Sequence, residues 1–118
     1  VMVIDKDRLD VPPRWYDLPA GFVFHVGNAW EEPASGAIRL DCMRFDDAWL
    51  AMVGMKQTMR GHFAGSARPR PTIIELDRAS GRARQTVLSD HEAEFPRIDP
   101  RRVGLRHAML LAAERVDG

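Results

Sequence analysis

Hydrophobic and polar positions fall in short runs along most of this chain, which predicts strands more often than helices. Val1 to Asp5 is an apolar run typical of a strand. Two prolines at residues 12–13 remove ladder donors, so a loop is expected from there to Pro19. Residues 22–26 combine aromatic and β-branched side chains and predict a strand that is buried on both faces and ends in a polar turn.

Two hairpins are predicted further along the chain. Residues 37–43 alternate apolar and polar side chains after a turn at residues 32–36, which indicates a return strand with one wet face. Residues 72–77 and 82–88 flank a turn in which Gly81 supplies a positive φ. Residues 105–113 fit strand or helix by composition.

The period changes between Phe45 and Phe63, where a short helix is expected. Apolar residues recur there at helical spacing: Trp49, Met52, Val53 and Met59. Asp46 or Asp47 is placed to cap the first turn, whereas Gly54 weakens the helix. A methionine and tryptophan stripe at this spacing favours core packing over a cofactor site. A loop is expected at residues 66–71.

The composition argues against several classes of protein but does not identify one. The 118 residues carry 17 basic and 17 acidic side chains, interspersed without a block of one sign, so nothing points to nucleic acid. The single cysteine, Cys42, excludes an internal disulfide and fits a reducing compartment, so a cytoplasmic location is expected. No apolar run approaches the ~20 residues of a membrane span. The chain opens inside a strand with no residues leading into it, which predicts a fragment.

His25 is the first candidate for chemistry, because it lies near the end of the apolar run at residues 22–26. A buried neutral imidazole must find a partner for each ring nitrogen, since an unpaired buried polar group costs about 1–3 kcal/mol. A metal on one nitrogen and a carboxylate on the other would satisfy both. Backbone carbonyls in a protein core would do so as well, and this alternative stays open.

Two motifs carry a family resemblance. They are Phe24-His25 followed after two residues by Asn28-Ala29-Trp30-Glu31-Glu32, and Glu94-Phe95-Pro96-Arg97-Ile98-Asp99. Together they resemble the carotenoid cleavage oxygenase family, which includes the bacterial lignostilbene dioxygenases. The resemblance implies an all-β fold, with residues 1–118 as an internal fragment of a single seven-bladed β-propeller domain. The fragment would comprise roughly two blades with a short helical insertion.

The same resemblance implies chemistry at two residues. In the family, four histidines hold a non-haem Fe(II) ion, and His25 aligns with one of them. Glu94 stands where the family has a carboxylate that accepts a ring N–H from an iron ligand, and we assign it to His25. The substrates would be O2 and an apolar conjugated alkene, either a carotenoid, an apocarotenoid or a stilbene, cleaved to two carbonyl products. Three ligands lie outside the chain, so the fragment alone is expected to be inactive.

Other candidates receive less weight. Glu31 and Glu32 follow the His25 strand but point to opposite sides of an extended backbone. The side chain of Asn28 is expected to tie down the polar turn, and aromatic residues are candidates for inner packing: Phe22, Phe24 and Trp30. Histidines 62 and 107 have no motif around them. The parent protein could also contact a membrane peripherally.

Two alternative functions remain. One is a non-catalytic β-sheet interaction module, in which His25 is a core residue and Glu94 a turn carboxylate. The other is a small metal hydrolase built on a loose cluster of possible ligands, in which a solvated loop is the simpler interpretation. The cluster comprises Asp90, His91, Glu92 and Glu94.

Overall fold

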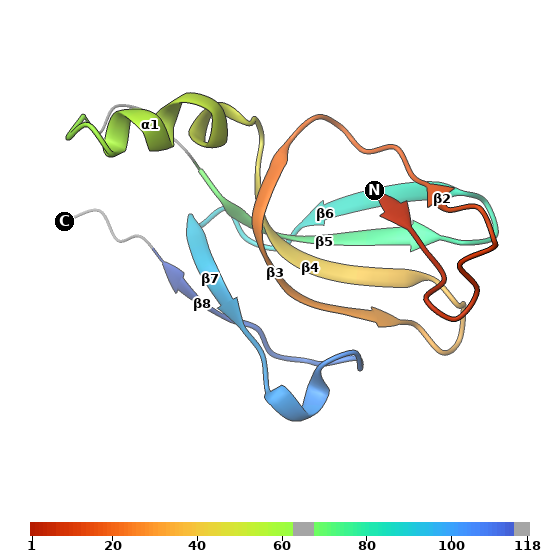
Figure 1. Ribbon diagram of the computed structural model, residues 1–118. Coiled ribbons are helices and arrows are strands. Elements are labelled where there is room, and N and C mark those ends of the chain that lie inside the picture. The colour runs from red at the N-terminus through yellow and green to blue at the C-terminus, as the bar shows by residue number, and fades with distance from the viewer. Residues whose placement is uncertain (63–67, 115–118) are drawn as a thin grey trace.

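The computed structural model describes residues 1–62 and 68–114, and its strands form three antiparallel sheets (Figure 1). The central sheet has the order β3 (Phe22–Glu31), β4 (Ile38–Phe45), β5 (Arg70–Asp77) and β6 (Arg82–Val87). Two smaller sheets pair β1 (Met2–Val3) with β2 (Arg14–Trp15), and β7 (Ala93–Arg97) with β8 (Leu111–Glu114). Short helical segments are η1 (Leu50–Gly54), α1 (Met55–Thr58) and η2 (Pro100–Arg102). The expected all-β architecture with a short helical insertion is therefore observed.

The core lies against the central sheet. Ile74 and Leu76 alternate with less buried residues along β5, Cys42 on the neighbouring β4 is fully buried, and Tyr16 from the segment after β2 belongs to the same cluster. Leu76 is 1% exposed, and burying an aliphatic side chain of this size contributes about 1.5–3 kcal/mol. This core holds the sheet on which the candidate site is built.

Both predicted hairpins are confirmed. β3 and β4 pair antiparallel around a turn in which Gly36 has a φ of 68°. β5 and β6 pair with Asp77 opposite Arg82, and Gly81 has the expected positive φ of 70°. The Asp77 carboxylate accepts the backbone N–H groups of Ala79 and Ser80 within that turn. These elements form where the sequence signal is local.

The first strands differ from the expectation. Only Met2 and Val3 of the run at residues 1–5 are paired, and their partner is β2, which falls in the predicted loop. β3 does not end at Val26 but continues to Glu31, so the segment expected to be a polar turn is a strand. It remains extended because Asn28 and Trp30 are buried there while Ala29 between them is exposed.

β4 does not have the wet face that its alternation predicts. Asp41 is 2% exposed and Arg44 is 7% exposed. The Arg44 guanidinium donates to the carbonyls of Pro19 and Ala20, each at 2.7 Å, and Asp41 is covered by the segment that precedes β8. Each buried polar side chain has a specific hydrogen-bond partner, which is the condition for burying it.

A helix forms in the expected region, but its apolar stripe is not core. Met52 is 76% exposed and Met59 is 87% exposed. A Cβ on Gly54 would lie 2.6 Å from the Trp49 ring, so the glycine lets the indole fold onto its own helix. Asp47, one of the two predicted caps, accepts the Trp49 N–H at 2.8 Å. Phe63, the expected limit of this region, and residues 66–67 of the predicted loop lie outside the described residues.

The small sheet of β7 and β8 lies beside the first half of β3 (Figure 1). Composition leaves residues 105–113 open between helix and strand, the family resemblance favours strand, and the structure forms a strand at Leu111–Glu114. β7 was not predicted as a strand. In the part of the chain that the structure describes, no helix is long and apolar enough to cross a membrane.

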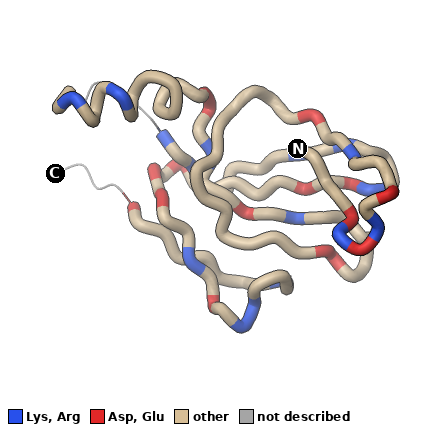
Figure 2. The backbone as a smooth tube through the Cα atoms, viewed as in Figure 1, with Lys and Arg blue, Asp and Glu red and all other residues tan. Residues whose placement is uncertain are grey.

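Acidic and basic side chains are interspersed over the whole trace (Figure 2). On one face of the central sheet they form a ladder in which Glu75 of β5 pairs with Arg39 of β4 at 2.7 Å and Arg84 of β6 at 3.0 Å. Oppositely charged neighbours across strands each contribute roughly 0.2–1 kcal/mol. The ladder therefore supports the register of the sheet and leaves no block of one charge.

Cys42 can report on whether this core is formed. Its side chain is fully buried, and burial raises the pKa of the thiol to about 11. At pH 8 only about one thiol in a thousand is then the reactive thiolate. In the native full-length protein we expect iodoacetamide to modify Cys42 at least about 100-fold more slowly than in urea, measured by mass spectrometry of its peptide.

The same measurement on residues 1–118 alone should give a different result. Among the residues that the structure describes, β3 and β6 are the outer strands of the central sheet and have no further partner. The β3 side chains of Phe24 and Val26 are exposed, so we expect an aggregating or molten chain. Cys42 should then react at nearly the rate seen in urea. A protected thiol together with a sharp cooperative melt would contradict this expectation.

Candidate functional site

The two predicted site residues lie in contact. Nδ1 of His25 on β3 is 2.8 Å from Oε2 of Glu94 on β7, although 69 positions separate them in sequence. The same carboxylate oxygen accepts the backbone N–H of Phe95 at 3.1 Å. A carboxylate accepts, so the imidazole donates from Nδ1, and this hydrogen bond determines which ring nitrogen carries the proton.

Irregularities in both strands present these side chains. The pairing of β3 with β4 shifts register twice between residues 23 and 28, around His25. The pairing of β7 with β8 shifts between Glu94 and Arg97, where Phe95 has a φ of 58°. Such bulges turn side chains away from the regular alternation of a strand, and a positive φ is unusual for a phenylalanine. The Phe95 ring lies 5.2 Å from the imidazole, centroid to centroid.

The expectation that His25 is buried was wrong. Its side chain is 46% exposed, whereas that of Glu94 is 18% exposed. Neighbouring Phe24 and Val26 are also exposed, so β3 is not covered on both faces here. Phe24 packs instead against Phe22 and Phe45 at the edge of the sheet. Phe95 is 61% exposed, so the local burial expected around Glu94 does not extend to its neighbour.

The pair has the chemistry of a metal ligand with a supporting carboxylate. With Nδ1–H donated to Glu94, Nε2 carries the lone pair, and no hydrogen bond to Nε2 is found within residues 1–62 and 68–114. Oε1 of Glu94 is buried and unpaired among the same residues. A carboxylate behind an imidazole aims the ring and raises its basicity. The residues present therefore fit a metal on Nε2.

One histidine does not make a complete metal site. In the described part of the chain, no group of three or more histidine, cysteine or acidic residues could hold a metal ion. This includes the cluster around His91, whose imidazole pairs with the carboxylate of Glu114. That contact raises the pKa of His91, first through the hydrogen bond and then through the charge of Glu114. His91 is exposed, and it belongs to a surface pair.

Glu31 and Glu32 form ion pairs away from His25. Glu31 accepts from Arg78 at 3.2 Å, and Glu32 lies 3.2 Å from Arg39. Among the described residues, neither carboxylate forms a hydrogen bond or ion pair with the His25 imidazole. Their low weight as acid or base candidates agrees with these contacts.

Sequence reasoning missed a buried polar network behind β3. His107, which has no motif, places Nε2 2.5 Å from Oδ2 of Asp41. Asn28 does not tie down a neighbouring turn, as predicted, but binds a loop that lies more than 70 positions later. The signal available in the sequence was the polar Asp41 within an otherwise apolar strand, which was interpreted as a solvent-facing residue.

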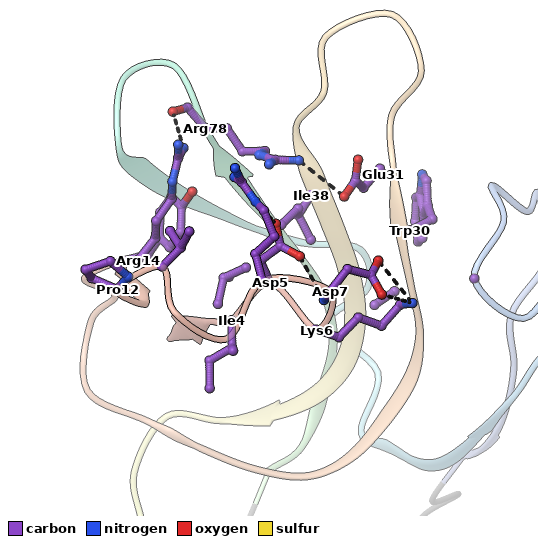
Figure 3. Close-up of a pocket in the computed structure, with 16 residues that line it drawn as sticks. Ile4, Asp5, Lys6, Asp7, Pro12, Arg14, Trp30, Glu31, Ile38 and Arg78 are labelled. Atoms are coloured by element: carbon purple, nitrogen blue, oxygen red, sulfur yellow. Dashed lines mark hydrogen bonds and ion pairs between the residues drawn. The ribbon is translucent and has the colours of Figure 1, made fainter.

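A pocket of about 500 Å³ lies at the opposite end of β3 (Figure 3). It is formed between the N-terminal segment and the ends of β3 and β4, and Trp30, Glu31 and Ile38 contribute to its wall. The charged groups drawn around it are paired, including Arg78 with Glu31 and Lys6 with Asp7. His25 and Glu94 do not line this pocket. It is therefore separate from the candidate metal ligand.

Comparison with known proteins places the chain in a family. The sequence model of the retinal pigment epithelial membrane protein family (RPE65) matches residues 1–116. A carotenoid 9,10(9',10')-cleavage dioxygenase of Arabidopsis thaliana is 33% identical over 94 residues, which are 80% of this chain and 16% of the relative. A carotenoid cleavage oxygenase of Mycobacterium tuberculosis is 28% identical over 109 residues, 91% of this chain and 20% of the relative.

Comparison with solved structures points to the same family. Cobalt-substituted apocarotenoid oxygenase of Synechocystis superimposes with a TM-score of 0.72 at 25% identity. The match covers 88% of this chain and 21% of that one. The chain thus spans about a fifth or less of the proteins it matches. On the family match and these relatives together, the chain belongs to the family of carotenoid cleavage oxygenases and retinal pigment epithelial membrane proteins.

Proposed function

We propose that this chain is part of a non-haem iron(II) dioxygenase that cleaves a carbon–carbon double bond of a carotenoid or apocarotenoid. The observation that carries the proposal is the hydrogen bond from His25 to Glu94, which leaves Nε2 open, within a chain that the family matches over residues 1–116. In the reaction, both bonds of the C=C unit break and each carbon receives one oxygen atom of O2. Two carbonyl products account for every atom.

His25 would be one iron ligand, through Nε2, and Glu94 would orient it. Because Glu94 accepts a hydrogen bond from Nδ1–H, the ring is kept in the tautomer whose Nε2 lone pair is available. The Phe95 ring beside the imidazole limits its rotation from one side. When bound, the ferrous ion supplies the redox chemistry that joins O2 to the alkene.

The remaining ligands would come from parts of the parent protein beyond this chain. We propose a seven-bladed β-propeller in which residues 1–118 form roughly two blades of one domain, and the matched relatives, which are roughly five times longer, have room for the remaining blades. Three further histidines would complete the iron site. This would explain why the described residues contain one oriented candidate ligand, His25, but no group of residues that could hold a metal ion by itself.

The relatives favour a carotenoid-type substrate. The Arabidopsis and Mycobacterium proteins are named for carotenoid cleavage, and the Synechocystis enzyme for apocarotenoids. A stilbene would undergo the same bond changes, and the residues that would distinguish it are expected in other blades. Incubating the full-length protein with an apocarotenal, a carotenoid and a hydroxylated stilbene under O2 would separate these classes by their aldehyde products.

Replacing His25 tests the central assignment. In full-length protein, we expect His25→Ala to reduce bound iron by at least about tenfold after dialysis and to abolish alkene cleavage, because one of four ligands is lost. Iron is measured by mass spectrometry of the metal, per mole of folded protein.

His91→Ala is the matched control. It removes an exposed histidine that pairs with Glu114, so iron content and cleavage should stay at the wild-type level. If His91→Ala lost iron while His25→Ala kept it, the metal site would lie at the other cluster and the proposed function would be wrong.

Glu94→Gln tests the supporting role of the carboxylate. An amide oxygen can still accept the Nδ1 proton but carries no charge, so we expect iron to dissociate about 10–100-fold faster into a chelator. Glu92→Gln changes a carboxylate two residues away that pairs with Arg68, and it should leave the dissociation rate unchanged. Equal rates in wild type and both variants would remove Glu94 from the site.

A further inference from the structure

A buried carboxylate and a buried imidazole form a pair behind β3. The side chains of Asp41 and His107 are 3% and 8% exposed. Nε2 of His107 lies 2.5 Å from Oδ2 of Asp41, and Nδ1 lies 3.0 Å from the carbonyl oxygen of Met109. Both ring nitrogens thus face oxygen acceptors, Nδ1 the carbonyl of Met109 and Nε2 the carboxylate of Asp41.

The other oxygen of Asp41 holds the backbone of β3. Oδ1 accepts the Asn28 N–H at 2.7 Å in a buried position. The Asn28 side chain then accepts the Gly104 N–H at 3.0 Å and donates to the carbonyls of Arg102 and Leu105. One asparagine therefore connects β3 to the loop after η2 through three hydrogen bonds.

These contacts occur at the irregular part of β3 that presents His25. The register shifts between residues 23 and 28. A Cβ on Gly27 would lie 2.2 Å from Oδ1 of Asp41, so the carboxylate occupies the space that a side chain would need. In a strand, a shift of one residue turns a side chain to the opposite face. The contact of Asp41 with Asn28 therefore lies at the end of the register shift, three residues from His25.

The same network reaches the strand pair that carries Glu94. His107 and Met109 lie directly before β8, and residue 113 of β8 is paired with Glu94 of β7. One end of the network is therefore three residues from His25, and the other end lies two residues before the strand that pairs with β7.

We propose that Asp41 and His107 are positioning residues for the candidate iron ligand. Through Asn28 on one side and β8 on the other, they hold the imidazole of His25 and the carboxylate of Glu94 at hydrogen-bonding distance. The inference rests on the proposed function where it concerns iron. The geometry of the His25 to Glu94 contact can be measured without metal.

Asp41→Ala and Asp41→Asn in the full-length protein separate positioning from packing. An asparagine can still accept the Asn28 N–H and can donate its amide N–H to Nε2 of His107, whose Nδ1 continues to donate to Met109. An alanine can do neither. We expect Asp41→Ala to release bound Co(II) about 10–100-fold faster than wild type and to change its visible absorption, whereas Asp41→Asn should remain close to wild type.

A second measurement uses the metal-free protein labelled with 15N-histidine. The His25 signals, identified by their loss in His25→Ala, should show a proton fixed on Nδ1 in wild type and in Asp41→Asn. In Asp41→Ala they should move to the averaged values of a ring that exchanges tautomers. Leu76→Ala is the control for general loss of stability, because it opens a cavity in the core and leaves every contact of the network in place.

The proposal is overturned if Asp41→Ala melts earlier, as Leu76→Ala does, but keeps the wild-type 15N signals of His25. If wild-type protein binds no Co(II), the proposed function fails, and the nitrogen signals still decide whether Asp41 positions the ring. Changed signals in Leu76→Ala equal to those in Asp41→Ala would show a packing effect and would also overturn the proposal.

Discussion

The candidate site depends on side-chain hydrogen bonds that join two sheets without a shared backbone ladder. His25 lies in the central sheet and Glu94 in the small sheet of β7 and β8. Contacts between residues 66 to 77 positions apart connect them: His25 with Glu94, His107 with Asp41, and Asn28 with the loop at residues 102–105. Among these contacts, that of His107 with Asp41 is buried, and leaving one partner of a buried contact unpaired costs about 1–3 kcal/mol. The relative position of the two strands is therefore specified by a few polar groups.

Elements whose signals are local could be predicted from the sequence. The hairpin of β5 and β6 follows from two alternating runs around Gly81, and the hairpin of β3 and β4 from a turn at residues 32–36. β2 and β7 could not be predicted in the same way. Residues 14–15 form β2 because Met2 and Val3 pair with them, and residues 93–97 form β7 because β8 pairs with them. Short strands of this kind are created by tertiary pairing and carry little pattern of their own.

The site residues can be divided in the same way, into those that a local motif identifies and those that only tertiary contacts explain. The motifs identified His25 and Glu94, and the structure brings them together. Asp41 and His107 were not found, because an acidic residue that alternates with apolar ones normally faces solvent. Its burial depends on a histidine 66 positions later, which the alternation of a single strand does not contain. Met52 and Met59 show the opposite error. Their helical spacing predicts core packing, but both are exposed, because spacing alone does not establish what covers a helix face.

Within these residues, the His25 ring is neither fully enclosed nor freely exposed. An imidazole enclosed on all sides has no coordination position left, and a freely exposed one has no fixed direction. Here the ring is 46% exposed while its supporting carboxylate is 18% exposed. The side that carries Nδ1 is held by Glu94 and flanked by Phe95, and Nε2 is left open. Under the proposed function, Glu94 supplies the orientation of the ring, and Nε2 is available to a metal.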